Sequence, residues 1–496
     1  MKKTLLVILA LILALSTFVS CNGNNKNPEG TQPSSDETGD TIASALGFES
    51  ENNNFDDFNV LLNNSEGAFN MALDFYAEEA DSDVVSKQVL ARNHACEEYL
   101  GITINYHREP GNWNSGMPQK IYTLVSGGSS EYDMVVMGLN TGIMGGYVSI
   151  YQNVLEMDYV DTDHSWWVQE IEEMVSINNR LVFLTGDACL STYAYLGCVF
   201  ANLTVAENYT LFEDGRTFYD LVNEDQWTME TFFSMFQEVG LDQMGDGTYD
   251  PKVDTFGWAN IQTSVRVMWS SCDMNLIIRN EEDGSFVVRP SLDDTILRFM
   301  TDIRTACEDK LSIHFTQAET ETAVNAFVND RCLFASYYVY LAQDFKANNM
   351  ESLFAVLPLP KYNAQQEDYI STNISAYNAL FFPATIKNPA LSAKVAEFMG
   401  YYGQKNVVPA YYDENLKLRN NDVGQANVEM LDLIRDKLRV TPNELYGTIG
   451  DIIGLTPTTE KNMSSTGFYY STTTIWGEKY NTFNDGVANY IYQYYR

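Results

Sequence analysis

The feature that most constrains the fold is an alternation of strand-like and helix-like segments between residues 58 and 137. Residues 58–62 (FNVLL), 102–106 (ITINY) and 132–137 (YDMVVM) have the apolar or alternating pattern of strands. Residues 86–100 and 120–125 lie between them and carry apolar side chains at helical spacing. Strands separated by helices are joined by right-handed crossovers, so this region predicts a mostly parallel sheet.

Two loops follow strands of this sheet and are candidates for a ligand site. In parallel sheets, ligands bind beyond the carboxyl ends of the strands, where loops and helix N-termini meet. The loops are residues 63–67 (NNSEG) and 138–142 (GLNTG). Asn140 in the second loop offers an amide to a ligand, and a solvated surface position is the alternative.

The rest of the chain continues this mixture and predicts an α/β fold. Further strands are expected at residues 181–184, 198–201, 333–338, 354–358 and 378–383. Further helices are expected at residues 227–239, 293–311, 390–402, 423–438 and 483–495. Thr228 is expected to cap the first of these helices.

The first 21 residues, MKKTLLVILALILALSTFVSC, have the pattern of an export signal. Lys2 and Lys3 precede an apolar stretch that is too short and too abruptly ended for a membrane-spanning helix. The end of the segment resembles the bacterial lipoprotein box, although Phe18 stands where leucine is usual. The resemblance implies a signal peptide at residues 1–20 and a lipid on Cys21, and ordinary secretion is the alternative.

Residues 21–54 are rich in Asn, Ser, Gly, Pro and Glu, which predicts a flexible tether. The whole chain has 30 Lys+Arg against 67 Asp+Glu, a formal net charge of −37. Such a surface repels phosphate backbones and anionic lipid head groups. Nucleic acid is therefore excluded as a partner, and attachment to a membrane requires an anchor. We expect a body held by its lipid at the extracytoplasmic face of the cell membrane.

Six cysteines follow Cys21: Cys96, Cys189, Cys198, Cys272, Cys307 and Cys332. An even number in an exported chain permits disulfides, with Cys189 and Cys198 as the nearest pair, and buried free thiols are the alternative. None lies in a CxxC motif, so the cysteines do not predict a metal site.

Five segments, taken in order, resemble the extracellular solute-binding proteins of bacterial ABC importers, especially the large maltose-binding-like lipoproteins. They are the helix–Gly–strand of Cys96–Ile104, the Gly-rich turn and "YD" strand of Gly127–Val135, Ser165–Trp167 followed by Ile177–Phe183, the return strand Asp330–Phe334, and the turn Leu357–Lys361. The similarity spans roughly residues 58–440, and the order of the segments carries it.

The resemblance implies a two-lobed periplasmic-binding-protein-like fold of the class II type, with a solute in the cleft between the lobes. Crossover strands are expected near residues 185–201, 333–338 and 376–383. Lobe 1 is expected at residues 55–190 and 333–380, and lobe 2 at residues 191–332 and 381–496. Solute binding would shift the protein from open to closed forms, which the permease would recognise.

The 31 Tyr and 7 Trp residues favour a carbohydrate, because sugar sites use flat aromatic faces together with carboxylates and amides. One of the adjacent pair Trp166 and Trp167 is a candidate platform, and a structural pair is the alternative. Trp269 precedes Asp273 by one helical turn, which suggests a joint contact with a sugar. A core tryptophan with a capping aspartate is the alternative interpretation.

Four further residues are candidates at the expected crossovers. Asp187 is expected in the first one, facing the cleft, or else in an Asx turn with Gly186. Tyr337 and Tyr340 follow the return strand, where the resemblance implies an aromatic contact with the solute. Asn373 supplies an amide from a loop, with a solvated surface as the alternative.

Residues 242–254 look like a calcium loop in which one ligand position is occupied by Met244 and the last by Val253. Methionine and valine cannot supply the hard oxygen ligands that calcium needs, so we read a degenerate loop and expect no metal and no cofactor. The sequence lacks the HExxH, GxSxG and GxxxxGK[ST] motifs.

The expected function is therefore capture of a solute, a carbohydrate or oligosaccharide, by a monomeric non-enzyme that delivers it to an ABC permease. Two alternatives remain open. One is a surface-anchored carbohydrate hydrolase, which also uses carboxylates and aromatic residues. The other is a solute-binding component of a sensor.

Overall fold

The computed structural model describes residues 39–446, except for 65–68, 79–80, 82, 111–115, 144–147, 262–263, 281–284, 289–292, 374–376 and 417–421. The predicted signal peptide, Cys21, the first part of the tether and the predicted helix 483–495 lie outside the described residues. Within those ranges, no helix has both the length and the apolar composition needed to cross a membrane.

The first sheet contains the alternation that the sequence predicted and forms the centre of lobe 1. Its strand order is β11-β3-β1-β2, and β1 pairs in parallel with both β2 and β3. β11 comes from much later in the chain and pairs antiparallel with β3. The elements up to the first crossover are α2 (Gly39–Leu46), β1 (Asp56–Asn64), η1 (Met71–Asp74), α3 (Val84–Leu100), β2 (Ile102–Pro110), α4 (Met117–Ser126), β3 (Met134–Gly138), α5 (Leu139–Ile143), η3 (Val154–Glu156) and α6 (Ile171–Val175).

The second sheet forms the centre of lobe 2, with strand order β10-β4-β9-β5-β8. β5 pairs in parallel with β8 and β9, and β4 is antiparallel to both β9 and β10. The elements are β4 (Gly197–Asn202), α8 (Leu203–Asn208), α9 (Phe218–Asn223), α10 (Met229–Gln237), β5 (Phe256–Ile261), α11 (Ser264–Ser271), β6 (Ile277–Arg279), β7 (Phe286–Val288), α12 (Asp294–Glu308), β8 (Ser312–Phe315), η4 (Gln317–Glu319), α13 (Thr320–Val328), β9 (Cys332–Tyr338), α14 (Leu341–Ala347) and β10 (Phe354–Pro358).

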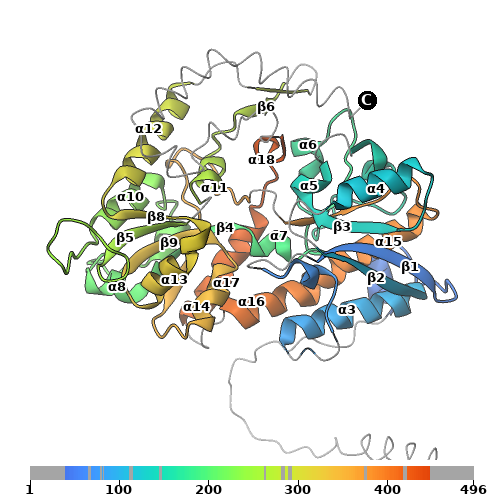
Figure 1. Ribbon diagram of the computed structural model, residues 1–496, viewed down its shortest axis with the longest axis horizontal. Helices are drawn as coiled ribbons and strands as arrows, with labels where there is room; N and C mark the ends of the chain where they lie inside the picture. Colours follow the sequence, from blue (N-terminus) through green and yellow to red (C-terminus); the bar gives the residue numbers. More distant parts are fainter. Residues whose placement is uncertain are drawn as a thin grey trace, which may run out of the picture. The chain divides into compact units, whose positions relative to one another are not determined.

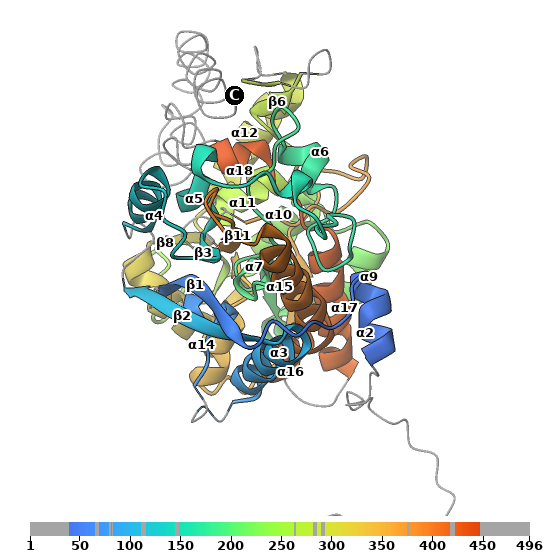
Figure 2. The ribbon, with the colours of Figure 1, turned by 90° about the vertical axis from the view of Figure 1, so that its right-hand side faces the viewer.

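The chain runs between the two sheets along three routes in the described part. The first, residues 185–196, contains α7 (Ser191–Ala194), and the second, residues 359–377, leads from β10 to β11 (Asn378–Phe381). The third leaves α15 (Pro389–Tyr402) through the π-helical turn η5 (Gly403–Val407) and α16 (Val408–Leu416) to α17 (Asp422–Asp436), before α18 (Pro442–Tyr446). In Figure 1, α7, α16 and α17 lie between the two sheets. α15 packs beside α3 in lobe 1, as Figure 2 also shows, whereas α17 packs on β10 in lobe 2.

Two of these routes touch backbone to backbone. Gly186 has a φ of 153°, and a Cβ there would overlap the carbonyl oxygen of Trp166. A Cβ on Gly403 would overlap the carbonyl oxygen of Asp187, so the third route passes directly against the backbone of the first because residue 403 has no side chain.

The predicted α/β alternation and two-lobed fold are confirmed, but the boundaries of the lobes need correction. β9 lies between β4 and β5, so residues 333–338 are an inner strand of lobe 2 and not a crossover. β10 also belongs to lobe 2, while α15 belongs to lobe 1. A strand pattern reveals that a segment is buried on both faces, but it does not reveal which sheet the strand enters.

Two smaller expectations also differ from the structure. Residues 181–184 form no strand, and only Leu184 makes an isolated bridge, to Leu380 of β11. Part of the segment assigned to the tether is folded, because α2 spans Gly39–Leu46 and buries Leu46 and Phe48 in the core. Thr228 does cap α10, since its side chain accepts a hydrogen bond from the backbone N–H of Thr231.

Candidate functional site

A cleft of about 1000 Å³ lies between the two lobes. One wall is formed by described residues between Asn64 and Ser86 of lobe 1, together with Arg108 near the end of β2. The facing wall is α14 and the residues just after it in lobe 2, and Tyr411 of α16 completes the lining. All three sources meet at the point where β1, β2 and β9 end, which is where α/β sheets bind ligands.

Two helix caps hold the lobe 1 wall in place. The Asn70 side chain accepts a hydrogen bond from the N–H of Ala72 at 3.2 Å and starts η1. Asp83 accepts one from the N–H of Ser86 at 2.8 Å and starts α3. Such caps satisfy backbone donors that would otherwise lack a partner at a helix start. The local sequence therefore fixes the starts of η1 and α3, which both belong to this wall.

Tyr76 and Arg108 give this wall its aromatic and cationic character. The Arg108 guanidinium lies 4.1 Å from the centroid of the Tyr76 ring, within range of a cation–π interaction. The Tyr76 hydroxyl donates a 3.4 Å hydrogen bond to Glu78, and the Asp81 carboxylate accepts one from the N–H of Glu78 at 2.8 Å. A ligand at this wall therefore contacts a half-buried aromatic ring that has a guanidinium over it and carboxylates nearby.

The lobe 2 wall is an arrangement of amides and an amine. Gln343, Lys346 and Asn349 all line the cleft, and the first two lie three residues apart on α14. Tyr411 is buried opposite them, and its burial raises the pKa of its hydroxyl while a hydrogen bond with Gln343 opposes this. The hydroxyl therefore stays protonated at neutral pH. Both walls thus offer donors and acceptors suited to a polyhydroxylated ligand.

Tyr337 and Tyr340 belong to a buried aromatic cluster next to this cleft rather than to its lining. Tyr337 lies 4.4 Å from Tyr338, and Tyr340 lies 5.2 Å from Tyr195 of the first crossover. Phe69 of lobe 1 then joins Tyr195 to Tyr411, with ring centroids 6.1 and 6.2 Å apart. Tyr337 is 4% exposed, and this burial raises its pKa to about 12. The cluster spans the junction of the lobes beside the cleft.

The two candidate tryptophans are core residues. The Trp166 indole N–H donates a 2.7 Å hydrogen bond to Glu397 of α15, and its ring lies 4.1 Å from His164. A Cβ on Gly400 would overlap the same ring, so neither face is open to a solute. Trp269 is 1% exposed and packs edge-on against Phe299 in lobe 2. Both indoles are buried within their lobes, Trp166 against α15 and Trp269 of α11 against α12.

Asp187 and Asn373 lie in the crossovers, as predicted, but both are buried there. Asp187 is 1% exposed, and its carboxylate lies 3.9 Å from the Arg435 guanidinium of α17. Burial raises the pKa of Asp187 to about 6, and the positive charge of Arg435 opposes this rise. Asn373 is 3% exposed and hydrogen-bonds with Tyr377, an interaction that lowers the pKa of the tyrosine against the larger effect of burial.

The last two candidates, Asn140 and Asp273, lie at different places. Asn140 is half-buried in α5, directly after β3, and accepts a hydrogen bond from Thr141 at 3.2 Å. Asp273 is exposed and lines a smaller cavity of about 270 Å³ between the lobes, together with Glu173, Arg279 and Arg439. The structure therefore brings none of the eight predicted residues into the lining of the larger cleft.

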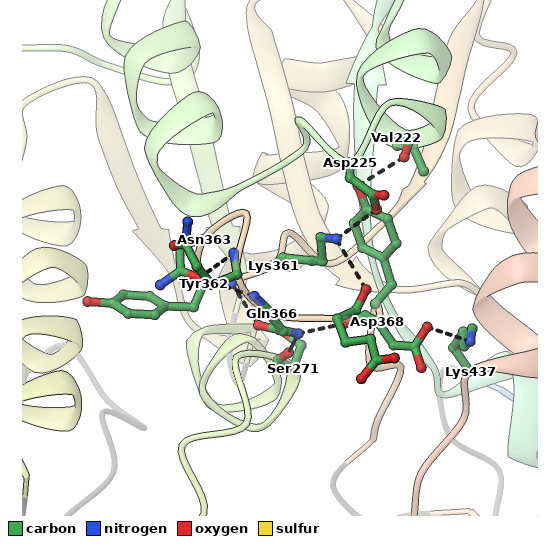
Figure 3. A network of polar contacts seen from close by, with 12 residues as sticks. Val222, Asp225, Ser271, Lys361, Tyr362, Asn363, Gln366, Asp368 and Lys437 are labelled. Carbon is green, nitrogen blue, oxygen red and sulfur yellow. Dashed lines mark hydrogen bonds and ion pairs between the residues drawn. The ribbon is translucent and has the colours of Figure 1, made fainter.

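The second crossover is fastened to lobe 2 by a polar network (Figure 3). Lys361, 1% exposed, donates a 2.7 Å hydrogen bond to Asp225 at the turn after α9. Gln366 donates to the carbonyl oxygens of Ser271 at 2.9 Å and of Asp368 at 2.8 Å. Lys437, after α17, donates to Asp368 at 2.7 Å. Residues 361–368 are thus held by three different parts of lobe 2.

The predicted degenerate calcium loop is closed by its own hydrogen bonds. The Asp242 carboxylate accepts from the N–H groups of Gly245 at 2.5 Å and Gly247 at 2.8 Å. Asp254 accepts from the N–H groups of Gln243 and Asp250, each at 2.8 Å. These carboxylates therefore act as turn caps. The six cysteines of the described part are free thiols, so the disulfide that the sequence permitted between Cys189 and Cys198 is not formed.

Among the described cleft-lining residues, Asn64 alone lies in a loop that was predicted to bind a ligand, residues 63–67, and two others carry a usable signal. Gln343 and Lys346 follow the carboxyl end of a predicted strand at helical spacing, which is where such folds bind ligands. Asn70, Tyr76 and Arg108 gave no such signal, because they reach the cleft only through the path of the segment between β1 and α3 and the length of β2.

No protein-family model matches the sequence, and no curated protein matches it at a significant level. Similarity is found among solved structures. The structure of a cyclo/maltodextrin-binding protein in complex with maltotetraose aligns with 88% of this chain and 96% of its own, with a TM-score of 0.52 and 11% identity.

Two further structures agree. The galacto-N-biose/lacto-N-biose I-binding protein of an ABC transporter from Bifidobacterium longum aligns with 88% of this chain and 99% of its own, with a TM-score of 0.52 and 12% identity. The apo form of RafE from Streptococcus pneumoniae aligns with 89% and 98%, with a TM-score of 0.50 and 12% identity. At such identities the likeness concerns the fold. The chain has the two-lobed α/β fold of these proteins.

Proposed function

We propose that this chain is a lipid-anchored, extracytoplasmic solute-binding protein that captures an oligosaccharide between its lobes and delivers it to an ABC permease. The observation that carries the proposal is the cleft of about 1000 Å³, lined from both lobes by amides, charged groups and the ring of Tyr76. A ligand that touches both walls stabilises the closed arrangement, which is how a binding event becomes a signal to a permease.

The choice of carbohydrate rests on the chemistry of the walls and on the fold. Amides, carboxylates and a guanidinium can satisfy hydroxyl groups in both directions, and an aromatic face covers the apolar side of a pyranose ring. Proteins of the same fold are described in complex with maltotetraose and with lacto-N-biose. These two sugars are therefore suitable first probes.

The test is thermal unfolding of the mature chain with maltose, maltotetraose, lacto-N-biose and cellotetraose. A sugar at about 100 times its dissociation constant should stabilise the fold by roughly 2.7 kcal/mol and raise the unfolding midpoint. Recovery of the sugar intact would support binding. Cleavage of the sugar would replace the proposal with the hydrolase alternative, and no shift with any sugar would overturn the carbohydrate assignment.

A pair of tyrosine variants locates the site. Tyr76→Ala should weaken binding of the active sugar roughly tenfold, about 1.4 kcal/mol. The variant loses the aromatic face on which the sugar would stack and the cation–π contact that holds Arg108 beside it. The control is Tyr122→Ala, which removes a 43% exposed tyrosine of α4 that is outside the cleft lining. Equal affinity for both variants, measured by titration calorimetry, would place the sugar elsewhere.

The anchor and the delivery step are tested in cells. The full-length chain should partition into a detergent phase, and Cys21→Ser should move it to the aqueous phase, because the acylated residue is then missing. Cells without the chain should fail to take up the sugar that binds. Continued uptake together with a lost transcriptional response would favour the sensor alternative over the importer.

A further inference from the structure

Asp74, the last residue of η1, is a fully buried carboxylate with bonds to two distant parts of the chain. Its Oδ1 accepts a hydrogen bond from the N–H of Ser191 at 2.7 Å. Its Oδ2 accepts one from the Ser191 hydroxyl at 2.5 Å and another from the side-chain amide of Asn378 at 2.9 Å. All four donor and acceptor groups lie in the interior of the protein, where the strength of such bonds is not reduced by water.

The two partners of Asp74 belong to different crossovers. Ser191 begins α7 in the first crossover, and Asn378 begins β11 directly after the second. They are also bound to each other, because the N–H of Asn378 donates to the Ser191 hydroxyl at 3.0 Å. The amide of Asn378 donates further to the carbonyl oxygen of Met71 at 3.1 Å. One carboxylate therefore joins the middle of the first crossover to the lobe 1 end of the second.

A buried arginine completes the arrangement. Arg92 of α3 donates to the carbonyl oxygen of Asp74 at 2.5 Å and to that of Ala188, in the first crossover, at 3.1 Å. Burial raises the pKa of Asp74 to about 6, and the bonds from Ser191 and Asn378 and the charge of Arg92 oppose that rise. The group is thus held in its charged form at neutral pH by the residues that it positions.

The same short helix forms part of the cleft wall. Asn70, Ala72 and Leu73 line the cleft, and Asn70 caps η1. A solute that contacts these residues therefore contacts a helix whose last residue, Asp74, is bonded to the first and second crossovers. At the lobe 2 side, the second crossover is held separately by Lys361 and Gln366. Those bonds attach the second crossover to lobe 2 only, and Asp74 provides its attachment to lobe 1.

We propose that Asp74 is the positioning residue of the junction between the lobes: it fixes the middle of the first crossover and the lobe 1 end of the second, and links their position to the cleft wall. The link to a solute rests on the proposed function, whereas the attachment itself does not. Asp74 touches no solute in this account and acts through Ser191 and Asn378.

The test is hydrogen–deuterium exchange of the mature chain without any sugar, comparing wild type, Asp74→Asn and Asp133→Asn. Asn keeps the shape of Asp74, but its NH₂ group faces a donor and one bond is lost. We expect exchange at least tenfold faster in peptides covering residues 185–196 and 377–381. The control, Asp133, is a half-buried lobe 1 aspartate that accepts the N–H of Asn59 at 2.8 Å, so its variant should leave these peptides unchanged.

Three results would overturn the proposal: acceleration in only one crossover, acceleration spread evenly over lobe 1, or the same pattern in both variants. An even spread would indicate a merely structural role. Ser191→Ala provides a second variant, since loss of its hydroxyl removes the bond to Asp74 and the acceptor for Asn378. It should accelerate the same two regions, and unchanged exchange would count against the proposal.

A pH profile separates positioning from general stability. Arg92, Cys189 and Tyr195 are the other titratable groups that interact with Asp74, and burial raises the pKa values of Cys189 and Tyr195 far above neutrality. Because burial raises the pKa of Asp74 above its ordinary value of 3.8, protonation favours the form in which this carboxyl is buried, and exchange of residues 377–381, corrected for its intrinsic rate, should slow as pH falls through about 6 in wild type. In Asp74→Asn it should not, and an unaltered profile would contradict the assignment. Failure of every sugar to bind would overturn the proposed function but leave this test intact.

Discussion

The interiors of the two lobes are built in different ways. Lobe 2 has a cluster of aromatic rings in which Phe232 lies 5.8 Å from Trp227, 5.2 Å from Trp258 and 5.0 Å from Phe334. Lobe 1 has, at the equivalent depth, the buried carboxylate of Glu397, which accepts hydrogen bonds from Trp166 at 2.7 Å and Trp167 at 3.0 Å. Both lobes have apolar cores, to which lobe 2 adds a dense aromatic cluster and lobe 1 adds directional bonds to a buried carboxylate.

The difference follows from how each lobe is assembled. The aromatic cluster of lobe 2 forms between α9, α10, β5 and β9, which all lie within one continuous stretch of chain. Lobe 1 receives β11 and α15 only after the chain has built lobe 2 and returned. Hydrogen bonds are directional, so they fix the position in which an element from late in the sequence must pack, whereas hydrophobic burial alone fixes that position less precisely. The comparison predicts where each lobe is vulnerable.

The largest effect is expected for Trp227→Ala in lobe 2. Trp227 is fully buried, and its indole N–H donates to the carbonyl oxygen of Pro358 at 2.8 Å. Loss of the ring should lower the free energy of unfolding by about 3–5 kcal/mol through lost burial and a residual cavity. Guanidinium unfolding followed by far-UV circular dichroism measures this. A loss below 1 kcal/mol would mean that the cluster does not hold lobe 2.

A somewhat smaller effect is expected for Glu397→Ala in lobe 1. The substitution leaves the indole N–H groups of Trp166 and Trp167 and the N–H of Asp161 without their acceptor. The expected loss is about 3 kcal/mol, since unsatisfied buried donors and a broken ion pair both contribute. Glu98→Ala on the exposed face of α3 is the control and should stay near wild type. Exchange should rise in α15 and residues 161–167 but not in lobe 2.

The smallest effect is a dependence on pH confined to lobe 1. A hydrogen bond with Glu397 raises the pKa of His164 above its ordinary value of 6.5. Because the folded-state pKa is raised, the stabilisation is fully present below pH 6.5 and is lost as pH rises through the folded-state value. Wild type should lose stability over that window, and His164→Gln should not. Asp74 and Asp187 titrate at about 6, so their effects fall at lower pH. Identical dependence of stability on pH in wild type and His164→Gln would contradict the prediction that this effect comes from His164 in lobe 1.

Sequence patterns predicted the elements of both lobes but not how the elements are shared between them. The strands at 58–62, 102–106 and 132–137 were predicted correctly because their helices follow immediately and local pattern decides the fold there. β9 and α15 were placed in the wrong lobes because their partners are set by long-range pairing. Local patterning does not specify which sheet a buried strand completes.

The site was predicted less well, for a related reason. Trp166 and Asp187 were predicted from their residue types and positions, but both are buried, Trp166 bonded to Glu397 and Asp187 lying 3.9 Å from Arg435. The cleft is lined instead by residues such as Tyr76 and Gln343, whose exposure depends on the separation of two walls. The separation of the two walls depends on how the lobes are assembled, so it cannot be predicted from a short stretch of sequence.

The close backbone contacts at Gly186 and Gly403 have a consequence for substitution at these two positions. A Cβ on Gly186 would overlap the carbonyl oxygen of Trp166, and a Cβ on Gly403 would overlap that of Asp187. Each obstacle is backbone, so no change of a neighbouring side chain can make room for a larger residue. The path of the chain through the junction of the lobes is therefore fixed at two places by the absence of a side chain.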